Sequence, residues 1–380
     1  MLGLEDLVAL PTVGAHPQLG KLTLTAKLPR RPGVYVFRDA GRRPLYVGKA
    51  VDLRRRVRSY FTGDDRRKIG GLLRELAAID HIECSSELEA SVLEVRMIHE
   101  LAPRYNTRTK DWRSYSYVKL TLDEPWPRLS AVRAPRAADG CFYLGPVGSM
   151  RTARRIIEAI EAAIPIRRCH ARLPAIVAPR AAGPCAPAQL GVACCPCAGA
   201  TPVAEYQAMT QRLLAALTGD PRPLLDPLSA RLRRLAGQQR YEEAAELRDR
   251  AAALSRALER QRRFDAIRRC GALTVATPDG AWATIDRGVM VDAGGAPPPD
   301  RPDDDARSTP HASRATPAFP VSADLPLPRH LVDEVATITS WLEARADRIR
   351  LLASEQPLWW PADRLPTFTP NETSSKKTQP

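Results

Sequence analysis

The chain has 380 residues, which is enough for two or three ordinary domains with packed cores. Lysine and arginine number 57 against 43 acidic residues, giving a formal net charge of +14. Residues 1–70 hold 15 basic and 6 acidic side chains, so +9 of this charge lies in under a fifth of the chain. This excess favours a polyanionic partner, either nucleic acid or an acidic membrane surface. The 35 prolines and the 6% aromatic content argue against one uniform fold.

The composition gives no sign of a signal peptide or a membrane span. The longest uncharged run, residues 181–204, contains four prolines and consists mainly of Ala, Gly and Cys. We therefore expect a cytoplasmic protein without a membrane partner. In that compartment the eight cysteines would be thiols or metal ligands rather than disulfides.

The first half of the chain predicts a small antiparallel sheet with flanking helices. Residues 33–48 have the β-branched and aromatic pattern of a hairpin, and a helix is predicted over 50–61. A third strand is expected at 79–84. The next helix, 86–101, begins with a capping box formed by Ser86 and Glu89, and it ends before Pro103.

Further elements follow at shorter spacing. Their predicted ranges are strands at 116–122, 128–132 and 142–144, a helix at 152–164, a helical hairpin with arms at 224–236 and 241–264, a strand pair within 271–291, and a helix at 331–353. Residues 300–328 are rich in proline and charge, so we expect a linker there. The tail after Thr369 is expected to be disordered.

The first predicted helix carries a basic and aromatic face. Lys49, Arg56 and Tyr60 are spaced i, i+7 and i+11, beside an apolar stripe. More positive charge comes from Arg54, Arg55 and Arg58. By itself this face is equally typical of a solvated basic surface.

The second helix contains a carboxylate within an otherwise apolar stripe. Glu94 interrupts the row of Ala90, Met97 or Ile98, and Leu101. An unpaired buried carboxylate costs several kcal/mol, so a cation is expected to meet it. Two interpretations remain open, an ion pair with an arginine and a metal ligand in a cleft.

Two short motifs in the hairpin resemble those of GIY-YIG nucleases, with valine in both central positions. They are Gly33-Val34-Tyr35 and Tyr46-Val47-Gly48. The functional positions of that family match, in order, Tyr35, Tyr46, Lys49, Arg56, Tyr60, Glu94 and Asn106. Over roughly residues 27–169 the chain is similar to the N-terminal half of the UvrC family of excinucleases. The segments Pro103–Asn106, Pro127–Leu129 and Gly145-Pro146 add to this similarity.

The resemblance implies a metal-dependent DNA endonuclease. Glu94 would hold one Mg²⁺ or Mn²⁺, and Arg56 would stabilise the phosphate. Tyr35 is our first choice as the base, although the resemblance does not decide between it and Tyr46. A phenol of pKa near ~10 would have to be lowered by roughly 3 units, which we expect nearby cations to do. Lys49 would lie beside the tyrosines, whereas Tyr60 and Asn106 would position them. DNA contacts are expected from Lys49, Arg54, Arg55 and Arg58.

Five cysteines are concentrated in a segment rich in alanine and proline. They are Cys169, Cys185, Cys194, Cys195 and Cys197. Some of them could be incidental, but a metal clamp by zinc or an iron–sulfur cluster would stabilise a segment with so little apolar bulk. UvrC-like proteins have four cysteines here, which implies a [4Fe–4S] cluster. Position 193, where the third is expected, is alanine, so Cys194 or Cys195 must take that role.

Residues 241–249 are similar to the UVR motif, the hairpin through which UvrC binds UvrB. This resemblance implies partner-binding residues, which are Tyr241, Glu242, Ala245, Arg248 and Leu254. The apolar stripe of Leu247, Ala251, Leu254 and Leu258 would be poorly buried by two helices alone, so we expect a docked partner to cover it. A generic helical hairpin is the alternative.

We therefore predict an α/β (α+β) GIY-YIG nuclease domain followed by a Cys-rich segment, a helical UVR hairpin and a partly disordered C-terminal region. The predicted boundaries are 1–26 (extension), 27–110 (nuclease), 111–168 (UvrC-like extension), 169–203 (Cys-rich), 204–266 (helical region with the hairpin), 267–296 (strand-rich), 297–330 (linker), 331–365 (helix) and 366–380 (tail).

The predicted function is a structure-specific, lesion-directed incision on the 3′ side in nucleotide excision repair, with DNA and a UvrB-type protein as partners. A non-catalytic adaptor and a standalone GIY-YIG endonuclease are the alternatives. After residue 270 we find neither a ribonuclease H-type nuclease nor helix-hairpin-helix motifs. That segment is instead similar to the UvrC-like halves that some actinobacterial proteins fuse to an exonuclease. We expect one incision chemistry rather than two.

Overall fold

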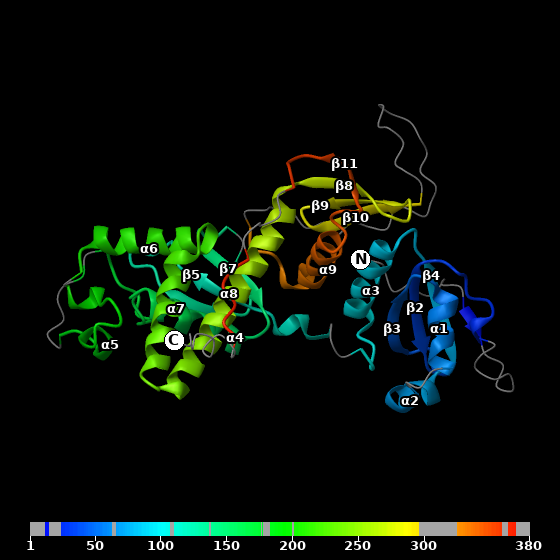
Figure 1. Cartoon of the computed structure of the whole chain (residues 1–380), viewed down its shortest axis with the longest axis horizontal. Helices are drawn as coiled ribbons and strands as arrows, with labels where there is room; N and C mark the ends of the chain where they lie inside the picture. The colour runs from blue at the N-terminus through cyan, green and yellow to red at the C-terminus, as the bar shows by residue number, and fades with distance from the viewer. Residues whose placement is uncertain are drawn as a thin grey trace, which may run out of the picture. The chain divides into compact units, whose positions relative to one another are not determined.

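The computed structural model describes residues 12–14, 24–62, 66–106, 110–136, 138–175, 177, 183–199, 201–295, 325–358 and 364–369. The chain divides into two compact units (Figure 1). The first unit comprises residues 1–113, 266–323 and 330–359, and the second comprises 114–265, 324–329 and 360–380. The main segment of the second unit, residues 114–265, therefore separates two segments of the first unit in the sequence.

The sheet that carries the two GIY-YIG-like motifs is antiparallel, with strand order β1-β4-β2-β3. Its strands are β1 (Thr12–Gly14), β4 (Ala78–Glu83), β2 (Gly33–Arg38) and β3 (Pro44–Ala50). The predicted hairpin and third strand are thus confirmed. Three helices accompany the sheet, α1 (Leu53–Thr62), α2 (Arg66–Glu75) and α3 (Glu87–Leu101). Helix α2 was not predicted.

Alternation along β2 sends its side chains into two different cores. Tyr35 and Phe37 pack with residues of α1 such as Leu53 and Val57 on one face. On the other face, Val34, Val36 and Val47 pack against Ala90, Leu93 and Met97 of α3. Both faces of the sheet are covered, which makes β2 buried along its whole length.

Helix α3 begins at the predicted cap. The Ser86 hydroxyl accepts a hydrogen bond from the amide of Glu89, 3.1 Å away. The Glu89 carboxylate bonds Ser85 instead of the Ser86 amide, so only half of the predicted capping box forms. The backbone hydrogen bond from Ala102 to Ile98 then ends the helix just before Pro103.

A second antiparallel sheet in the first unit has the order β10-β9-β8-β11. Its strands are β8 (Ala272–Ala276), β9 (Trp282–Asp286), β10 (Val289–Gly294) and β11 (Arg350–Ser354), with helix α9 (Val332–Glu343) beside it. The prediction of one helix over 331–353, and over 331–365 as a C-terminal segment, is wrong in its second half. The helix ends at Glu343, and Arg350–Ser354 pairs with β8, whose edge would otherwise lack hydrogen-bond partners.

The second unit joins a three-stranded sheet to a helical bundle. The sheet has order β6-β5-β7, with β5 (Ser116–Leu120), β6 (Leu129–Val132) and β7 (Phe142–Val147), close to the predicted strands. Its helices are α4 (Met150–Ala163), α5 (Ala186–Gln189), α6 (Val203–Thr218), α7 (Arg222–Gly237) and α8 (Tyr241–Arg269). One apolar core runs through the sheet and α4, α6, α7 and α8.

The predicted helical hairpin is confirmed as α7 and α8, but its apolar stripe is not free. Leu247, Ala251, Leu254 and Leu258 are at most 4% exposed, because they are part of the core of the second unit. The expectation that a docked partner covers this stripe is therefore wrong, and Leu254 cannot present a binding surface while it is buried.

Several predictions lie outside the described residues. They are nearly all of the 300–328 linker and most of the tail. Among the helices that are described, none combines the length and the apolar character needed to cross a bilayer.

Candidate active site

The predicted site residues gather around β3, which is the edge strand of its sheet. An edge strand leaves backbone groups without partners, and here side chains satisfy them. Asn106 accepts from the Val47 amide at 2.9 Å and donates to the Val47 carbonyl at 2.8 Å. Two residues along the same edge, the Glu94 carboxylate accepts from the Lys49 amide at 3.2 Å. Asn106 and Glu94 are thereby fixed to the strand that carries Tyr46.

Three tyrosines form a cluster on the α1 side of this strand. The hydroxyls of Tyr35 and Tyr60 are 2.8 Å apart, and the ring centroids of all three tyrosines lie 6.0–6.3 Å from one another. Phe37 packs edge-on against Tyr60. The three tyrosines and Phe37 therefore pack as one aromatic cluster, in which the hydroxyls of Tyr35 and Tyr60 are hydrogen-bonded.

Gly48 makes this cluster possible. It lies directly opposite Tyr35 across the β2–β3 ladder. A Cβ atom at position 48 would lie 2.6 Å from Cζ of Tyr35 and 2.9 Å from Cε1 of Tyr46. The glycine of the second motif is thus required because the two catalytic candidates pack over its Cα.

Arg56 and Tyr60 project together from α1, as their spacing predicted. The Arg56 guanidinium lies 5.0 Å from the Tyr60 ring centroid and 3.4 Å from its hydroxyl. Lys49, in contrast, is not on this helix. It belongs to β3, because the helix starts only at Leu53, after Asp52 has capped it by accepting from the Arg55 amide. Lys49 therefore approaches from the sheet.

Burial raises the pKa values of two of these tyrosines, Tyr35 and Tyr46, whereas we expected the pKa of the base to be lowered. Desolvation, and after it the neighbouring tyrosines, raise the pKa of Tyr35 well above its ordinary value, whereas Arg56 lowers it by less. Burial also raises the pKa of Tyr46. The expectation that nearby cations lower the pKa of Tyr35 is wrong for this structure, because Tyr35 is only 1% exposed.

Glu94 lies near two cationic side chains, Lys49 and Arg56, but it forms no close ion pair with any described residue. Desolvation raises its pKa, and Lys49 and Arg56 act in the opposite direction. Its charge is one of the causes that raise the pKa of Tyr46, so these two residues are electrostatically coupled.

The donor set of Glu94 fits a hard divalent cation. One carboxylate oxygen accepts the weak 3.2 Å bond from Lys49, and the partly buried carboxylate has a raised pKa, so a bound cation would relieve a real electrostatic cost. A single carboxylate supplies few ligands. The remaining ligands would have to be waters and substrate oxygens.

The other predicted DNA-binding arginines differ in their surroundings. Arg55 and Arg58 are exposed on α1, whereas Arg54 is half-buried and donates to the carbonyl of Leu28 at 2.6 Å. A cavity of about 440 Å³ is lined by Lys49, Arg55 and Arg56, among others. Arg54 thus anchors the chain before β2, while Arg55 borders this cavity and Arg58 does not line it.

Sequence reasoning missed a polar network that holds Lys49. Its ammonium group donates to Ser91 at 2.7 Å and lies 3.6 Å from the Glu87 carboxylate. Glu87 in turn accepts from Arg345, which follows α9, at 2.6 Å. Glu87, Ser91 and Glu94 are spaced i, i+4 and i+7, so the helical periodicity could have revealed the first two. Arg345 has no local signal, because it is 258 residues away from Glu87.

The cysteine segment does not form a metal site over the described residues. The sulfurs of Cys195 and Cys197 are 3.0 Å apart, and Cys169 lies 3.4 Å from the Arg167 guanidinium. No group of three or more metal-ligating side chains occurs in the described part of the chain. The residues as placed do not fit a four-thiolate cluster, so zinc or iron–sulfur binding, including by Cys185 and Cys194, stays a prediction.

Comparison with known proteins defines the family. Residues 31–107 match the family model of the UvrC-like GIY-YIG domain. Residues 115–216 match that of the UvrC/Cho excinuclease middle domain. The chain is UvrC-like. Its two matched segments are consecutive, and they correspond to the nuclease segment of the first unit and to most of the second unit.

Full-length relatives are longer than this UvrC-like chain. A protein of Mycobacterium tuberculosis named as a putative bifunctional exonuclease/endonuclease is 38% identical over 90% of this chain and 52% of its own length. UvrABC system protein C of Desulforudis audaxviator is 38% identical over 61% of this chain and 37% of its own length. That of Syntrophus aciditrophicus is 39% identical over 62% and 37%. The chain thus spans about half or less of the length of the curated relatives it matches.

One solved structure matches a shorter part of this chain than those relatives do. It is the GIY-YIG N-terminal endonuclease domain of UvrC from Thermotoga maritima bound to magnesium, which is 33% identical. The match covers 24% of this chain and all of that domain, with a TM-score of 0.22.

Proposed function

We propose that this UvrC-like chain is a metal-dependent DNA endonuclease that cuts on the 3′ side of a lesion during nucleotide excision repair. The observation that carries the proposal is the convergence of Tyr46, Glu94, Lys49 and Arg56 at the edge of β3, within a UvrC-like GIY-YIG segment. These groups offer a carboxylate, two cations and a phenol in one place. Phosphodiester hydrolysis needs a proton acceptor and positive charge around the phosphorane.

In this proposal each side chain acts on a defined part of the reaction. When bound at Glu94, Mg²⁺ or Mn²⁺ supplies charge stabilisation at the phosphate. Arg56 contacts the same phosphate with its guanidinium, while Tyr60 holds Arg56 in place through its ring face and hydroxyl. Lys49, which Ser91 and Glu87 hold in place, contributes further positive charge near the phosphate.

We assign the proton acceptor to Tyr46 rather than to Tyr35. Tyr46 is partly exposed, and a cation bound at Glu94 would neutralise the carboxylate charge that raises the Tyr46 pKa, so deprotonating Tyr46 would become easier there. Tyr35 is 1% exposed, so a water has less access to its hydroxyl than to that of Tyr46. Tyr35 is therefore a positioning residue, and so is Asn106, which holds the strand that carries Tyr46.

Recruitment by a UvrB-type protein is part of the proposal, and it uses a different surface from the one we expected. The buried stripe of α8 is not available, but Tyr241 at the start of this helix is 66% exposed and Glu242 beside it is also exposed. Exposed aromatic residues are typical anchors of protein interfaces. We therefore place the contact at the loop end of the α7–α8 hairpin, which Tyr241→Ala should weaken in binding assays with a UvrB-type protein.

A nicking assay tests the enzymatic proposal. The full chain is given a lesion-bearing duplex, a UvrB-type protein and Mg²⁺ or Mn²⁺, and 3′-side nicks are mapped on a sequencing gel. Glu94→Gln should abolish nicking, whereas Glu100→Gln, an exposed carboxylate on the same helix, should leave it unchanged. Equal nicking by the wild type and Glu94→Gln would refute the assignment and favour a non-catalytic adaptor.

A further inference from the structure

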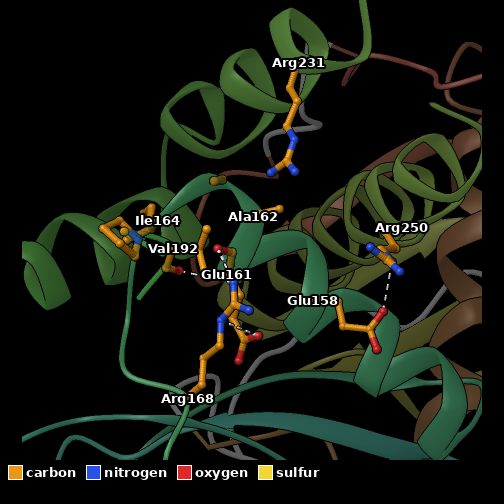
Figure 2. A pocket seen from close by; sticks show the side chains of 11 residues that line it. Glu158, Glu161, Ala162, Ile164, Arg168, Val192, Arg231 and Arg250 are labelled. Carbon is orange, nitrogen blue, oxygen red and sulfur yellow. Dashed lines mark hydrogen bonds and ion pairs between the residues drawn. The ribbon is translucent and has the colours of Figure 1, made fainter. Parts of the chain in front are cut away.

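The second unit contains a groove that the proposed nuclease site does not use. Two neighbouring cavities, of about 510 and 310 Å³, share Glu158 of α4 and Arg250 of α8 as lining residues. The larger one is shown in Figure 2, where Arg231 of α7 reaches toward it from the opposite side. Because they share these two residues, we treat them as one groove beside α4, called the α4 groove.

The acidic side chains of this groove already have cationic partners. Arg250 pairs with Glu158 at 2.9 Å and with Glu246 at 3.0 Å. Arg168 pairs with Glu161 at 3.3 Å (Figure 2). The fourth acid, Asp249, lies 2.8 Å from Arg248. None of these carboxylates is left to attract a cationic ligand.

Four further arginines of the groove have no such partner. They are Arg151, Arg154 and Arg155 of α4 and Arg231 of α7. All four are exposed, and none forms an ion pair or a hydrogen bond with the described residues. Unpaired guanidinium groups that share one groove repel one another, so they mark a place where anionic charge is expected to bind.

The spacing of these arginines matches the spacing of phosphates along a DNA backbone. Arg151 and Arg155 are about one helical turn apart, a rise of about 6 Å. The phosphates of one B-DNA strand rise by about 3.4 Å each along the helix axis and lie farther apart through space, because the backbone winds around that axis. Arg151 and Arg155 can therefore meet neighbouring phosphates of one strand. The planar guanidinium group binds phosphate oxygens in pairs, and it does so without reading base sequence.

We infer that the α4 groove, lined by Arg151, Arg154, Arg155 and Arg231, is a second DNA-binding surface that holds the phosphate backbone of the duplex flanking the incision. This inference rests on the proposed function for the identity of the polyanion. The groove adds affinity independent of base sequence, and the nuclease site keeps the chemistry. An acidic protein segment is the competing occupant, and the test distinguishes it.

The experiment uses the Glu94→Gln variant of the whole 380-residue chain, so that DNA is bound but not cut. Binding of a fluorescent, lesion-free duplex of about 40 base pairs is followed by anisotropy between about 50 and 200 mM salt. The test variant adds Arg151→Gln, Arg154→Gln and Arg155→Gln. The control variant adds Arg233→Gln, Arg234→Gln and Arg256→Gln, which are exposed arginines of the same unit outside the groove, so the change in net charge is identical.

Loss of three phosphate contacts should lower the slope of log affinity against log salt by about 2–3. The affinity of the test variant at low salt should fall at least about tenfold, while the control variant stays close to the parent. Equal slopes and affinities for the two variants would overturn the inference. So would loss of binding to polyglutamate in the test variant with DNA binding unchanged, because the groove would then belong to an acidic protein partner.

These outcomes are separate from failure of the proposed function. A wild-type chain that binds duplex but never nicks it, with any UvrB-type protein or metal, would count against the nuclease assignment alone. A wild-type chain that nicks normally, and whose groove variant binds DNA like the control, would count against the groove alone.

Discussion

The clearest energetic prediction concerns the ion pair that joins α9 to α3 within the first unit. Arg96 donates to Glu334 through two bonds of 2.8 and 2.6 Å and to the Met290 carbonyl at 2.6 Å. Glu334 also accepts from the Met290 amide at 2.9 Å, and its side chain is only 4% exposed. Arg96→Met keeps much of the length of the side chain but removes all of its donors. The change leaves Glu334 buried without a countercharge.

Breaking one side of a buried pair costs about 3–5 kcal/mol, because the remaining charge is desolvated and unpaired. With two units in the chain, a single global unfolding free energy is not well defined, so the local opening of α9 is the quantity to measure. Native-state hydrogen exchange followed by mass spectrometry reports it. Protection of residues 332–343 should fall by roughly two to four orders of magnitude.

Two further variants decide whether this reasoning holds. Arg96→Met combined with Glu334→Met should recover most of the lost protection, because no uncompensated charge remains. Arg104→Met, which breaks an exposed pair with Glu75, should cost less than about 1 kcal/mol. Unchanged protection of α9 in Arg96→Met, or an equal loss in the double variant, would refute the assignment of Arg96 as the countercharge of Glu334.

Four other predictions concern the site. Gly48→Ala should destabilise the first unit by about 1–3 kcal/mol and abolish most nicking, because a Cβ atom there overlaps Tyr35; near-normal melting and nicking would contradict the close packing. Arg345→Ala should lower kcat for nicking by about tenfold with little change in duplex affinity, since it frees Glu87 beside Lys49, whereas Arg348→Ala, an exposed residue near Arg345, should have no effect. Burial raises the pKa of Glu94 above 4.5, so Mg²⁺ affinity measured by calorimetry should fall on acidification before an ordinary glutamate would protonate. The stability that this raised pKa confers at low pH is lost as the pH rises through it, so Glu94→Gln should be more heat-stable than the wild type at neutral pH; a lower Tm would contradict the burial argument.

Local signals in the sequence were sufficient for most of the elements around the site. The alternation in Gly33–Phe37 and the cap at Ser86 depend on residues within one strand or one helical turn, and both are confirmed. The turn between α7 and α8 was also correctly located, within one residue. In each case the physical cause acts over a few residues, so the sequence displays it directly.

The wrong predictions depend on contacts made far along the chain. Residues 350–354 have no distinct strand pattern, and they become a strand because β8 offers an unpaired edge. The stripe around Leu254 looked unprotected because its cover comes from α4, α7 and the sheet of the same unit. The pKa of Tyr35 depends on burial that no motif reveals, and Arg345 joins the network of Lys49 only through the fold.

The α3–α9 contact also has a consequence for the order of synthesis. Arg96 and Glu334 are 238 residues apart, and nearly all of the second unit is translated between them. At about 5–20 residues per second, the nuclease segment exists for roughly 10–50 s before α9 leaves the ribosome. During that interval Arg96 lacks its countercharge, and Lys49 lacks the Glu87–Arg345 support. The nuclease segment expressed alone therefore corresponds to an assembly intermediate, and its kinetics should not be taken for those of the whole chain.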